Sequence, residues 1–524
     1  MPVGVRVRRA GSRRTLILGT LVPLLLAGCT VGPSTRPAVL ENDGPSPSES
    51  PAPTQQAPLP PLGETENSAV DWAGCDAETR VRLGKPAVPR ALRFSCAKIS
   101  NTVDSPSLPE RGTVRLSLLK VGTGKVPLVV VNDIGGAPGT LYAARLAATL
   151  PAEFLDRFSL IGVDRRYTGT SQQNACIPPE VREQLVGLDP AAADVEPLLD
   201  AARKAGQQCS IELGNDQGAL DAWHSAGDLE QIRIQLGMSR LHAIARGEGS
   251  RVLTIYAGRF TNHVGRVVLD GMPDPAGNAL TVWKGVAAGA ESTLDEFAEN
   301  CARRDCPLGK DARKTVDALV DQLRAEQATT PKGGRMGPSH ALYAIWTGLA
   351  QRDRWPELAT AIDEARDGKV DKLAAFTRPM LHATAAGQAR LDSTLATRCN
   401  DTVTRLTPDR INTVTEEWRR QHPVFGGLVA QQLVWCEPWP VRREPLPDLD
   451  VPGAPPIMLI STADDPVTPE IGTIRAGNQM STAVTVAWEG AGHGAVGHSS
   501  CVGEKVQAFL MAGKVPQRGT RCPA

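Results

Sequence analysis

The chain has 524 residues and carries 57 basic and 57 acidic side chains. It is too long for one ordinary domain, but the length suits an enzyme-sized core with a large insertion. Because the charges balance, we predict no surface for nucleic acid and no polyanionic partner. No motif indicates a bound cofactor.

The first 29 residues have the pattern of an export signal. Arginines between Arg6 and Arg14 precede a short apolar run, which ends just before Gly28 and Cys29. This run is shorter than the roughly 20 residues that span a bilayer, which argues against a transmembrane helix. The letters LLAGC resemble a bacterial lipobox, which implies a lipid anchor on Cys29 at the outer face of the cell membrane. A soluble secreted protein with a chance cysteine is the alternative.

Ten cysteines remain after Cys29, and an even number in an exported chain suggests five disulfides. Pairing between neighbours in sequence order is the simplest arrangement, although the sequence does not determine the connectivity. A zinc site is the competing interpretation, but no pair has Cys-x-x-Cys spacing and no histidines cluster nearby. The ten are Cys75, Cys96, Cys176, Cys209, Cys301, Cys306, Cys399, Cys436, Cys501 and Cys522.

Residues 30–67 are rich in proline, serine, alanine and glutamate, and they are predicted to form a disordered tether. Beyond them, continuous apolar runs alternate with helical patterns, which predicts an α/β fold with a mostly parallel sheet covered on both faces. The predicted strands are residues 113–121, 127–134, 158–164, 241–246, 263–271, 456–465 and 484–490.

Residues 272–440 interrupt this alternation with a helical pattern. Thr293 and Glu296 have the form of a capping box, which predicts a helix start. We expect a cap domain that roofs a pocket, inserted between core segments 68–271 and 441–524. One apolar helix stripe is expected to belong to the core of this cap, and its members are Leu342, Ile345, Trp346 and Leu349.

Residues 241–260 have the strand, turn and helix context of the nucleophile elbow Gly-x-Ser-x-Gly of α/β-hydrolases. In this alignment Gly247 stands at the serine position, and Glu248 and Gly249 follow it. A strand that ends at Arg246 fixes the alignment. The elbow is therefore predicted without its hydroxyl nucleophile.

The other members of a catalytic triad follow in the expected chain order. Asp465 lies in a loop after one predicted strand, and His493 lies after the next. The glycine-rich segment 132–140 follows an earlier strand, where an oxyanion loop belongs, and it contains Gly135 and Gly136.

These motifs together resemble the tripeptidyl-aminopeptidase-like branch of the α/β-hydrolases, which are actinobacterial serine exopeptidases related to prolyl aminopeptidases. The resemblance runs from about Asp71 to the C-terminus. It implies an exported enzyme that releases short peptides from free N-termini through a serine acyl-enzyme. The segments that carry it are VNDIGGAPG, GVDRRYTGTS, YAGRFTNHVGRVVLDG, DDPVTP, GAGHG and the tail from SSC to Cys522.

The chain departs from the family at the site itself. Gly247 replaces the serine of Gly-x-Ser-Tyr-Gly-Thr, and loss of a triad nucleophile costs about 10⁶-fold in kcat. Glu248 is expected to bring a carboxylate near the developing oxyanion. In Asn-Pro-Gly-Gly-Pro-Gly the first proline is Asp133, and Ile134 shifts the loop. In Asp-Pro-Arg-Gly-x-Gly the glycine is Tyr167, whose ring is expected near the pocket floor.

We therefore favour a non-catalytic, lipid-anchored protein that binds a peptide or small-molecule ligand under the cap, or that acts with an envelope partner. Asp465 and His493 then serve the fold, bonded to each other. The alternative is an active exported aminopeptidase or other hydrolase that uses an atypical nucleophile such as Ser250, one helical turn beyond Gly247. If Ser250 is not a nucleophile, we expect it to bond to the backbone near its helix start.

Overall fold

The structure is a computed structural model that describes residues 58–65, 67–103, 112–172, 175–330, 334–440 and 448–524. The signal segment with Cys29 and the predicted tether up to residue 57 lie outside these residues. Among the described helices, none is long and apolar enough to cross a membrane.

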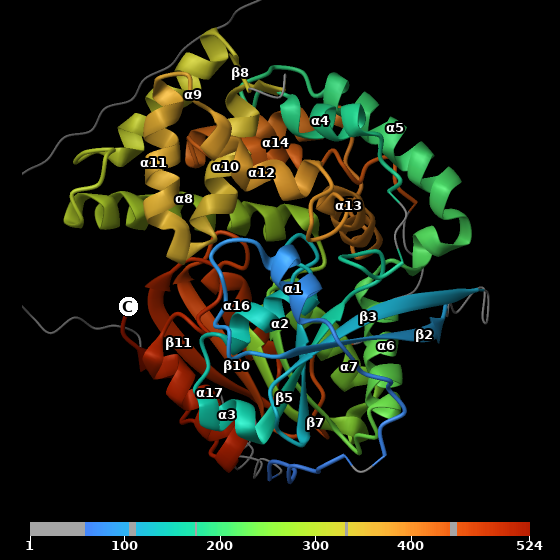
Figure 1. Cartoon of the computed structure of the whole chain (residues 1–524). Coiled ribbons are helices and arrows are strands. Elements are labelled where there is room, and N and C mark those ends of the chain that lie inside the picture. Colours follow the sequence, from blue (N-terminus) through green and yellow to red (C-terminus); the bar gives the residue numbers. More distant parts are fainter. Residues whose placement is uncertain (1–57, 66, 104–111, 173–174, 331–333, 441–447) are drawn as a thin grey trace, which may run out of the picture. The chain divides into compact units, whose positions relative to one another are not determined.

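Ten strands of the described chain form one sheet in the order β1-β2-β3-β5-β4-β6-β7-β10-β11-β12 (Figure 1). Neighbouring strands are parallel from β5 through β12, and the pairs at the other edge are antiparallel. The predicted mostly parallel sheet of an α/β fold is thus confirmed. The strands are β1 (Ala73–Gly74), β2 (Phe94–Thr102), β3 (Thr113–Val121), β4 (Val126–Val131), β5 (Phe158–Asp164), β6 (Leu241–Arg246), β7 (Val264–Asp270), β10 (Ile457–Asp464), β11 (Ala483–Ala491) and β12 (Thr520–Cys522).

All seven predicted strands are present, and their ends differ from the predictions by a few residues at most. The largest difference is at β4, which ends at Val131 rather than at Ile134. The chain turns there, and the Asn132 side chain donates to the Ala137 carbonyl at 2.7 Å. The predicted end of this strand therefore belongs to the loop beside the site.

Both faces of the sheet are buried, which explains why its central strands are continuously apolar. In β4, Leu128 and Val130 pack in one hydrophobic cluster, while Val129 and Val131 pack in another on the opposite face. The first face is covered by α1 (Asp76–Leu83), α2 (Gly139–Ala147), α3 (Ala152–Arg157) and α17 (Ser500–Ala512), and the second by α6 (Ala222–Gln235), α7 (Glu248–Arg259) and α16 (Glu470–Gln479).

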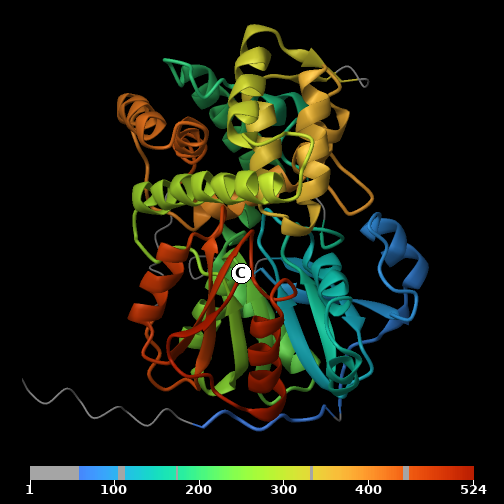
Figure 2. The same cartoon turned by 90° about the vertical axis from the view of Figure 1, so that its left-hand side faces the viewer.

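A third hydrophobic cluster forms the cap above the carboxyl ends of the strands (Figures 1 and 2). Helices α4 and α5 belong to it, although they precede the predicted insertion at residues 272–440. Leu342, Ile345 and Leu349 are buried in it, while Trp346 is only partly buried. Its helices are α4 (Pro179–Gly187), α5 (Glu196–Leu213), α8 (Ala279–Arg303), α9 (Ala312–Ala325), α10 (Pro338–Leu349), α11 (Trp355–Arg366), α12 (Asp371–Leu381), α13 (Arg390–Asn400), α14 (Pro408–Gln421) and α15 (Gly426–Gln431). A short hairpin of β8 (Ala328–Thr329) and β9 (Arg335–Met336) joins α9 to α10.

The capping box predicted at Thr293 and Glu296 is wrong, because both residues lie inside α8. The helix begins at Ala279, where the Asn278 side chain accepts from the Thr281 amide. Thr293 instead donates to the Gly289 carbonyl, one turn earlier, and to the Asp464 carbonyl at the end of β10. This threonine joins the cap to the sheet.

Five disulfides join the ten cysteines of the folded chain in sequence order, as the simplest arrangement predicts. One of them links the end of α13 to the segment after α15, next to the site described below. The pairs are Cys75–Cys96, Cys176–Cys209, Cys301–Cys306, Cys399–Cys436 and Cys501–Cys522.

Residues 58–65 fall within the predicted tether but pack against the core. Leu59 and Leu62 contact the cluster under α17, and the Pro60 carbonyl accepts from Arg266 Nε at 3.0 Å. The leucines in this proline-rich stretch supply the apolar surface for that packing.

Candidate functional site

The turn between β6 and α7 has the geometry expected of a nucleophile elbow. Gly247 lies between the strand and the helix with φ 56° and ψ −122°, a conformation that favours glycine. Its amide donates to the Asp270 carbonyl, and its carbonyl accepts from the Ser250 amide. The predicted alignment therefore places Gly247 where an α/β-hydrolase presents its nucleophile.

The carboxylate of Asp133 occupies the space in front of Gly247. A Cβ atom added to Gly247 would overlap Asp133 Oδ1. Asp133 is 8% exposed and lies in the loop after β4. A serine side chain at the elbow can therefore not coexist with this position of Asp133.

His493 lies between two carboxylates. Its Nδ1 is 3.0 Å from each oxygen of Asp465, and its Nε2 is 2.6 Å from Asp133 Oδ2. The other oxygen of Asp133 accepts from the Glu248 amide at 2.7 Å. In a working triad, Nε2 faces the nucleophile and that amide faces the oxyanion. Asp133 makes both contacts in their place.

The two carboxylates change the protonation of His493. Burial alone lowers the pKa of His493, but the charges of Asp465 and Asp133 outweigh burial and raise it to about 10. Burial also raises the pKa of Asp133, but the charge and hydrogen bond of His493, the charge of Arg246 and the Glu248 amide together lower this pKa to about 2. At neutral pH, His493 is therefore an imidazolium that donates through both ring nitrogens, and it has no lone pair with which to accept a proton.

Surrounding groups hold this cluster in place. Asp465 accepts from the amides of Val467 and Thr468 in the loop after β10. Asp270, at the end of β7, accepts from the amides of Ala495 and Val496 and so fixes the loop that carries His493. Each anchor comes from a different strand end.

Arg246, the last residue of β6, adds positive charge beside Asp133. It lies 3.7 Å from Asp133 Oδ2, donates to Asn132 Oδ1 at 3.1 Å, and stacks 4.3 Å from the Tyr142 ring centre. The sequence indicates it only as the end of a strand. In the sequence, an arginine directly before an elbow that lacks its serine is the signal that could have indicated a nearby carboxylate.

Comparisons with known proteins find similar peptidases and hydrolases. Residues 422–522 match the family model described as TAP-like protein. Serine protease Hip1 of Mycobacterium tuberculosis is 26% identical over 494 residues, which cover 88% of this chain and 92% of that protein. Tripeptidyl aminopeptidase of Streptomyces lividans is 24% identical over 479 residues, which cover 87% of each. The solved structure of a thermophilic esterase from Thermogutta terrifontis is 13% identical in sequence and has a TM-score of 0.35. The match covers 79% of this chain and 96% of the esterase chain.

The chain has an α/β-hydrolase fold and is similar over most of its length to a serine protease and a tripeptidyl aminopeptidase. The resemblance inferred from its motifs is thereby confirmed. The candidate acid Asp465 and base His493 lie within hydrogen-bond distance of each other at the strand ends, next to Gly247.

The predicted oxyanion loop lies beside the elbow, but the protein itself takes up one of its donors. Gly135 and Gly136 follow Asp133, and the Gly136 amide donates to the Asp133 carbonyl at 3.3 Å. The Glu248 amide is bonded to Asp133, as described above. The Glu248 side chain turns away from the elbow and pairs with Arg398 of α13 at 3.0 Å, so its charge is balanced.

Tyr167 and Ser250 lie differently from their predicted positions. The Tyr167 hydroxyl donates to Asp216 at 2.6 Å, and the ring lines only a small cavity beside Asp133 rather than the large one. Ser250 is fully buried, and its hydroxyl has no hydrogen-bond partner among the described residues. It therefore makes neither the expected backbone bond nor a bond to His493.

A cavity of about 440 Å³ lies between α7 and the cap. It reaches the triad at Thr468, whose hydroxyl donates to Asp465. Polar residues on its wall include Glu248 and Arg398. Its apolar wall includes Trp283, Trp346, Trp435, Met272 and Leu395. This volume and lining are typical of pockets for small organic ligands. Among the described residues, no group of histidines, cysteines and acids is placed to hold a metal.

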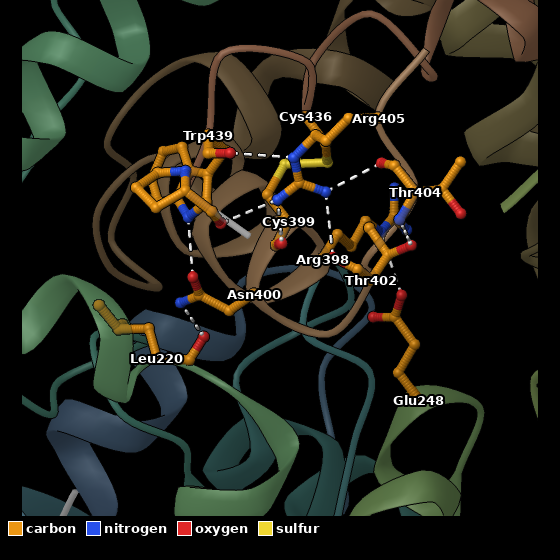
Figure 3. Close-up of a disulfide and its surroundings, with 11 residues drawn as sticks. Leu220, Glu248, Arg398, Cys399, Asn400, Thr402, Thr404, Arg405, Cys436 and Trp439 are labelled. Atoms are coloured by element: carbon orange, nitrogen blue, oxygen red, sulfur yellow. Dashed lines mark hydrogen bonds and ion pairs between the residues drawn. A yellow bond between two sulfur atoms is a disulfide. The ribbon is translucent and has the colours of Figure 1, made fainter. Parts of the chain in front are cut away.

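The Cys399–Cys436 disulfide supports one wall of this cavity (Figure 3). Arg398 extends from its edge toward Glu248, and Arg405 donates to the Cys399 carbonyl at 3.0 Å. Next along the chain, Asn400 donates to the Leu220 carbonyl of the core at 3.0 Å. The cap wall is thus joined to the core on both sides of the disulfide.

Replacing Asp133 should change the titration of His493. We expect the His493 ring to be protonated at pH 7 and to titrate near pH 10, and Asp133→Asn to lower its pKa because one of two flanking carboxylates is removed. NMR titration of the histidine rings measures both values. An unchanged pKa in Asp133→Asn would contradict the contact, and Asp295→Asn on α8 is the matched control.

The same pair predicts how stability depends on pH. The raised pKa of His493 stabilises the folded state fully below its ordinary value of 6.5, and this stabilisation is lost as pH rises through about 10. The lowered pKa of Asp133 stabilises the folded state at pH values above the ordinary pKa of 3.8, and this stabilisation is lost as pH falls through about 2. The free energy of unfolding should be measured with denaturant across pH for wild type and Asp133→Asn. The difference between the two proteins should shrink towards both pH limits.

Proposed function

We propose that this protein is an exported lipoprotein that binds a peptide or small-molecule ligand under its cap and has lost acyl transfer. The observation that carries the proposal is the Asp133 carboxylate, which bonds to His493 Nε2 and to the Glu248 amide in front of Gly247.

Acyl transfer needs a nucleophile, an unprotonated base and free donors for the oxyanion. Gly247 supplies no hydroxyl. His493 is held as an imidazolium by two carboxylates, and the Glu248 amide is already occupied. The Asp133 carboxylate opposes each requirement, because it fills the space of a serine side chain, helps to keep His493 protonated and occupies the Glu248 amide. It also repels the negative charge that develops on a substrate carbonyl oxygen.

The ligand cavity is retained beside this closed site. Its tryptophans offer broad apolar surfaces, and Glu248 and Arg398 offer an acceptor and a donor close to the elbow. The similar proteins include one named as a tripeptidyl aminopeptidase. A peptide is therefore the first ligand class to test. The alternative nucleophile Ser250 gains no support from its position, because it is buried and makes no contact with His493.

Fluorophosphonate labelling tests the loss of chemistry. We expect no labelling of the wild type, and none of Gly247→Ser, because its side chain would overlap Asp133. Gly247→Ser combined with Asp133→Pro, the residue of the family motif, should label and should turn over tripeptidyl reporters. This recovers part of the roughly 10⁶-fold that a triad contributes.

Matched variants make this test specific. Gly247→Ala with Asp133→Pro lacks a nucleophile and should stay unlabelled, and His493→Ala in the serine double variant should abolish labelling. Labelling of the wild type that Ser250→Ala removes would overturn the proposal. Equal labelling of Gly247→Ser with and without Asp133 would refute the blocking role of this carboxylate.

The lipid anchor is tested separately. In a bacterial host that processes lipoproteins, the full chain should partition into the detergent phase of Triton X-114, because acyl chains on Cys29 supply buried apolar surface. Cys29→Ala should move to the aqueous phase, while the neighbouring control Thr30→Ala should not. Partitioning unaffected by Cys29→Ala would refute anchoring. The five disulfides are consistent with an exported chain.

A further inference from the structure

A second, much smaller cavity of about 20 Å³ lies on the other side of Asp133. It is lined by the loop before α2, by residues 165 and 167–169 after β5, and by a cap loop that leads into α13. Gly136 on its wall is partly exposed to solvent. Such a space holds one small group rather than a whole ligand.

Arg165 is a buried cation on the wall of this cavity. It is 6% exposed, and within the described chain its side chain makes one hydrogen bond, a long one of 3.4 Å from Nη2 to Ser225 Oγ. Its Nε and Nη1 atoms are buried and have no partner among the described residues. A buried guanidinium is normally paired with an acid, because an isolated buried charge is costly.

The acids around Arg165 are engaged elsewhere. Four carboxylates act on its charge from a distance, but none forms an ion pair with it within the described chain. Their partners include His493 for Asp133, Arg398 for Glu248, the His224 ring for Asp221, and the Ala222 amide for Asp401. The unbonded nitrogens of Arg165 are therefore available to another anion.

Arg390 supplies a second guanidinium on the same wall. It is the first residue of α13, and its side chain has neither a hydrogen bond nor an ion pair among the described residues that flank it. Burial, together with the nearby charge of Arg145, lowers the pKa of Arg390 to about 10. No carboxylate offsets the charge of this arginine among the described residues.

Two helix N-termini meet at this cavity as well. Helix α2 begins at Gly139 and α13 begins at Arg390, and both residues line it. Carboxylates offset both termini, because the Thr140 amide of α2 donates to Asp164 at 2.9 Å and Asp392 lies in the first turn of α13. The two arginines are therefore the donors left for an anion in this cavity.

We propose that this cavity binds a small anionic group, of the size of a carboxylate, between Arg165 and Arg390. The two oxygens of a carboxylate match the forked donors of a guanidinium. The small volume favours a carboxylate over a phosphate ester. Arg165 and Asp133 both stand where the motifs of the similar family have proline.

The proposal does not depend on whether the elbow is inactive. The anion is either a free carboxylate or the carboxylate end of a larger ligand, and the chemistry of recognition is the same. In the second case, the free C-terminus of a peptide is the group that would enter beside Gly136.

Acetate is the probe for the site. The full chain in chloride-free sodium HEPES should show saturable acetate binding by isothermal titration calorimetry and a rise in Tm, beyond that of added sodium HEPES at equal ionic strength. Arg390→Gln should weaken acetate binding at least tenfold, whereas Arg203→Gln, an exposed arginine of α5, should not. Arg165→Lys keeps the charge but loses the fork, and it should also weaken binding.

Peptides distinguish the two sources. If the carboxylate belongs to a ligand, trialanine should displace acetate, and trialanine amide should not. If the anion is free, neither peptide should displace it. Absence of saturable acetate binding, or equal binding by the Arg390→Gln and Arg203→Gln variants, would overturn the proposal. Because these are binding measurements, their failure is separate from any result of fluorophosphonate labelling.

Discussion

The contact between Asp133 and His493 determines how the rest of the site is arranged. A neutral serine hydroxyl leaves the histidine free to take a proton, whereas a carboxylate at 2.6 Å holds the proton on the ring. The second oxygen of Asp133 occupies a backbone donor at the helix start. The histidine and acid of a hydrolase are thus retained with a different distribution of charge. Asp133 and Asp465 together neutralise the imidazolium of His493 and the charge of Arg246.

The cap shows how such a site is enclosed. Its helices form their own hydrophobic cluster, yet they meet the core through specific polar contacts such as Thr293 with Asp464 and Arg398 with Glu248. The Cys399–Cys436 disulfide lies between the contacts of Arg398 and Asn400. The wall of the large cavity therefore depends on a covalent link as well as on packing.

Much of the fold follows from local sequence, because strands buried on both faces need continuous apolar runs and because motif order fixes the elbow. The sequence identifies Asp133 as a lost proline, but it does not reveal that this residue meets Gly247 and His493, which are far away along the chain. The Glu248 to Arg398 pair is hidden for the same reason. The capping-box prediction at Thr293 fails because a local motif cannot show that it lies inside a longer helix.

The overlap between Asp133 and any side chain at position 247 also couples these two positions. A serine nucleophile at this elbow requires two substitutions in neighbouring side chains, and the geometry gives neither one an advantage alone. A serine at the elbow meets the carboxylate, and removal of the carboxylate leaves an elbow without a hydroxyl. Such epistasis means that no single substitution at either position installs a serine nucleophile in this elbow.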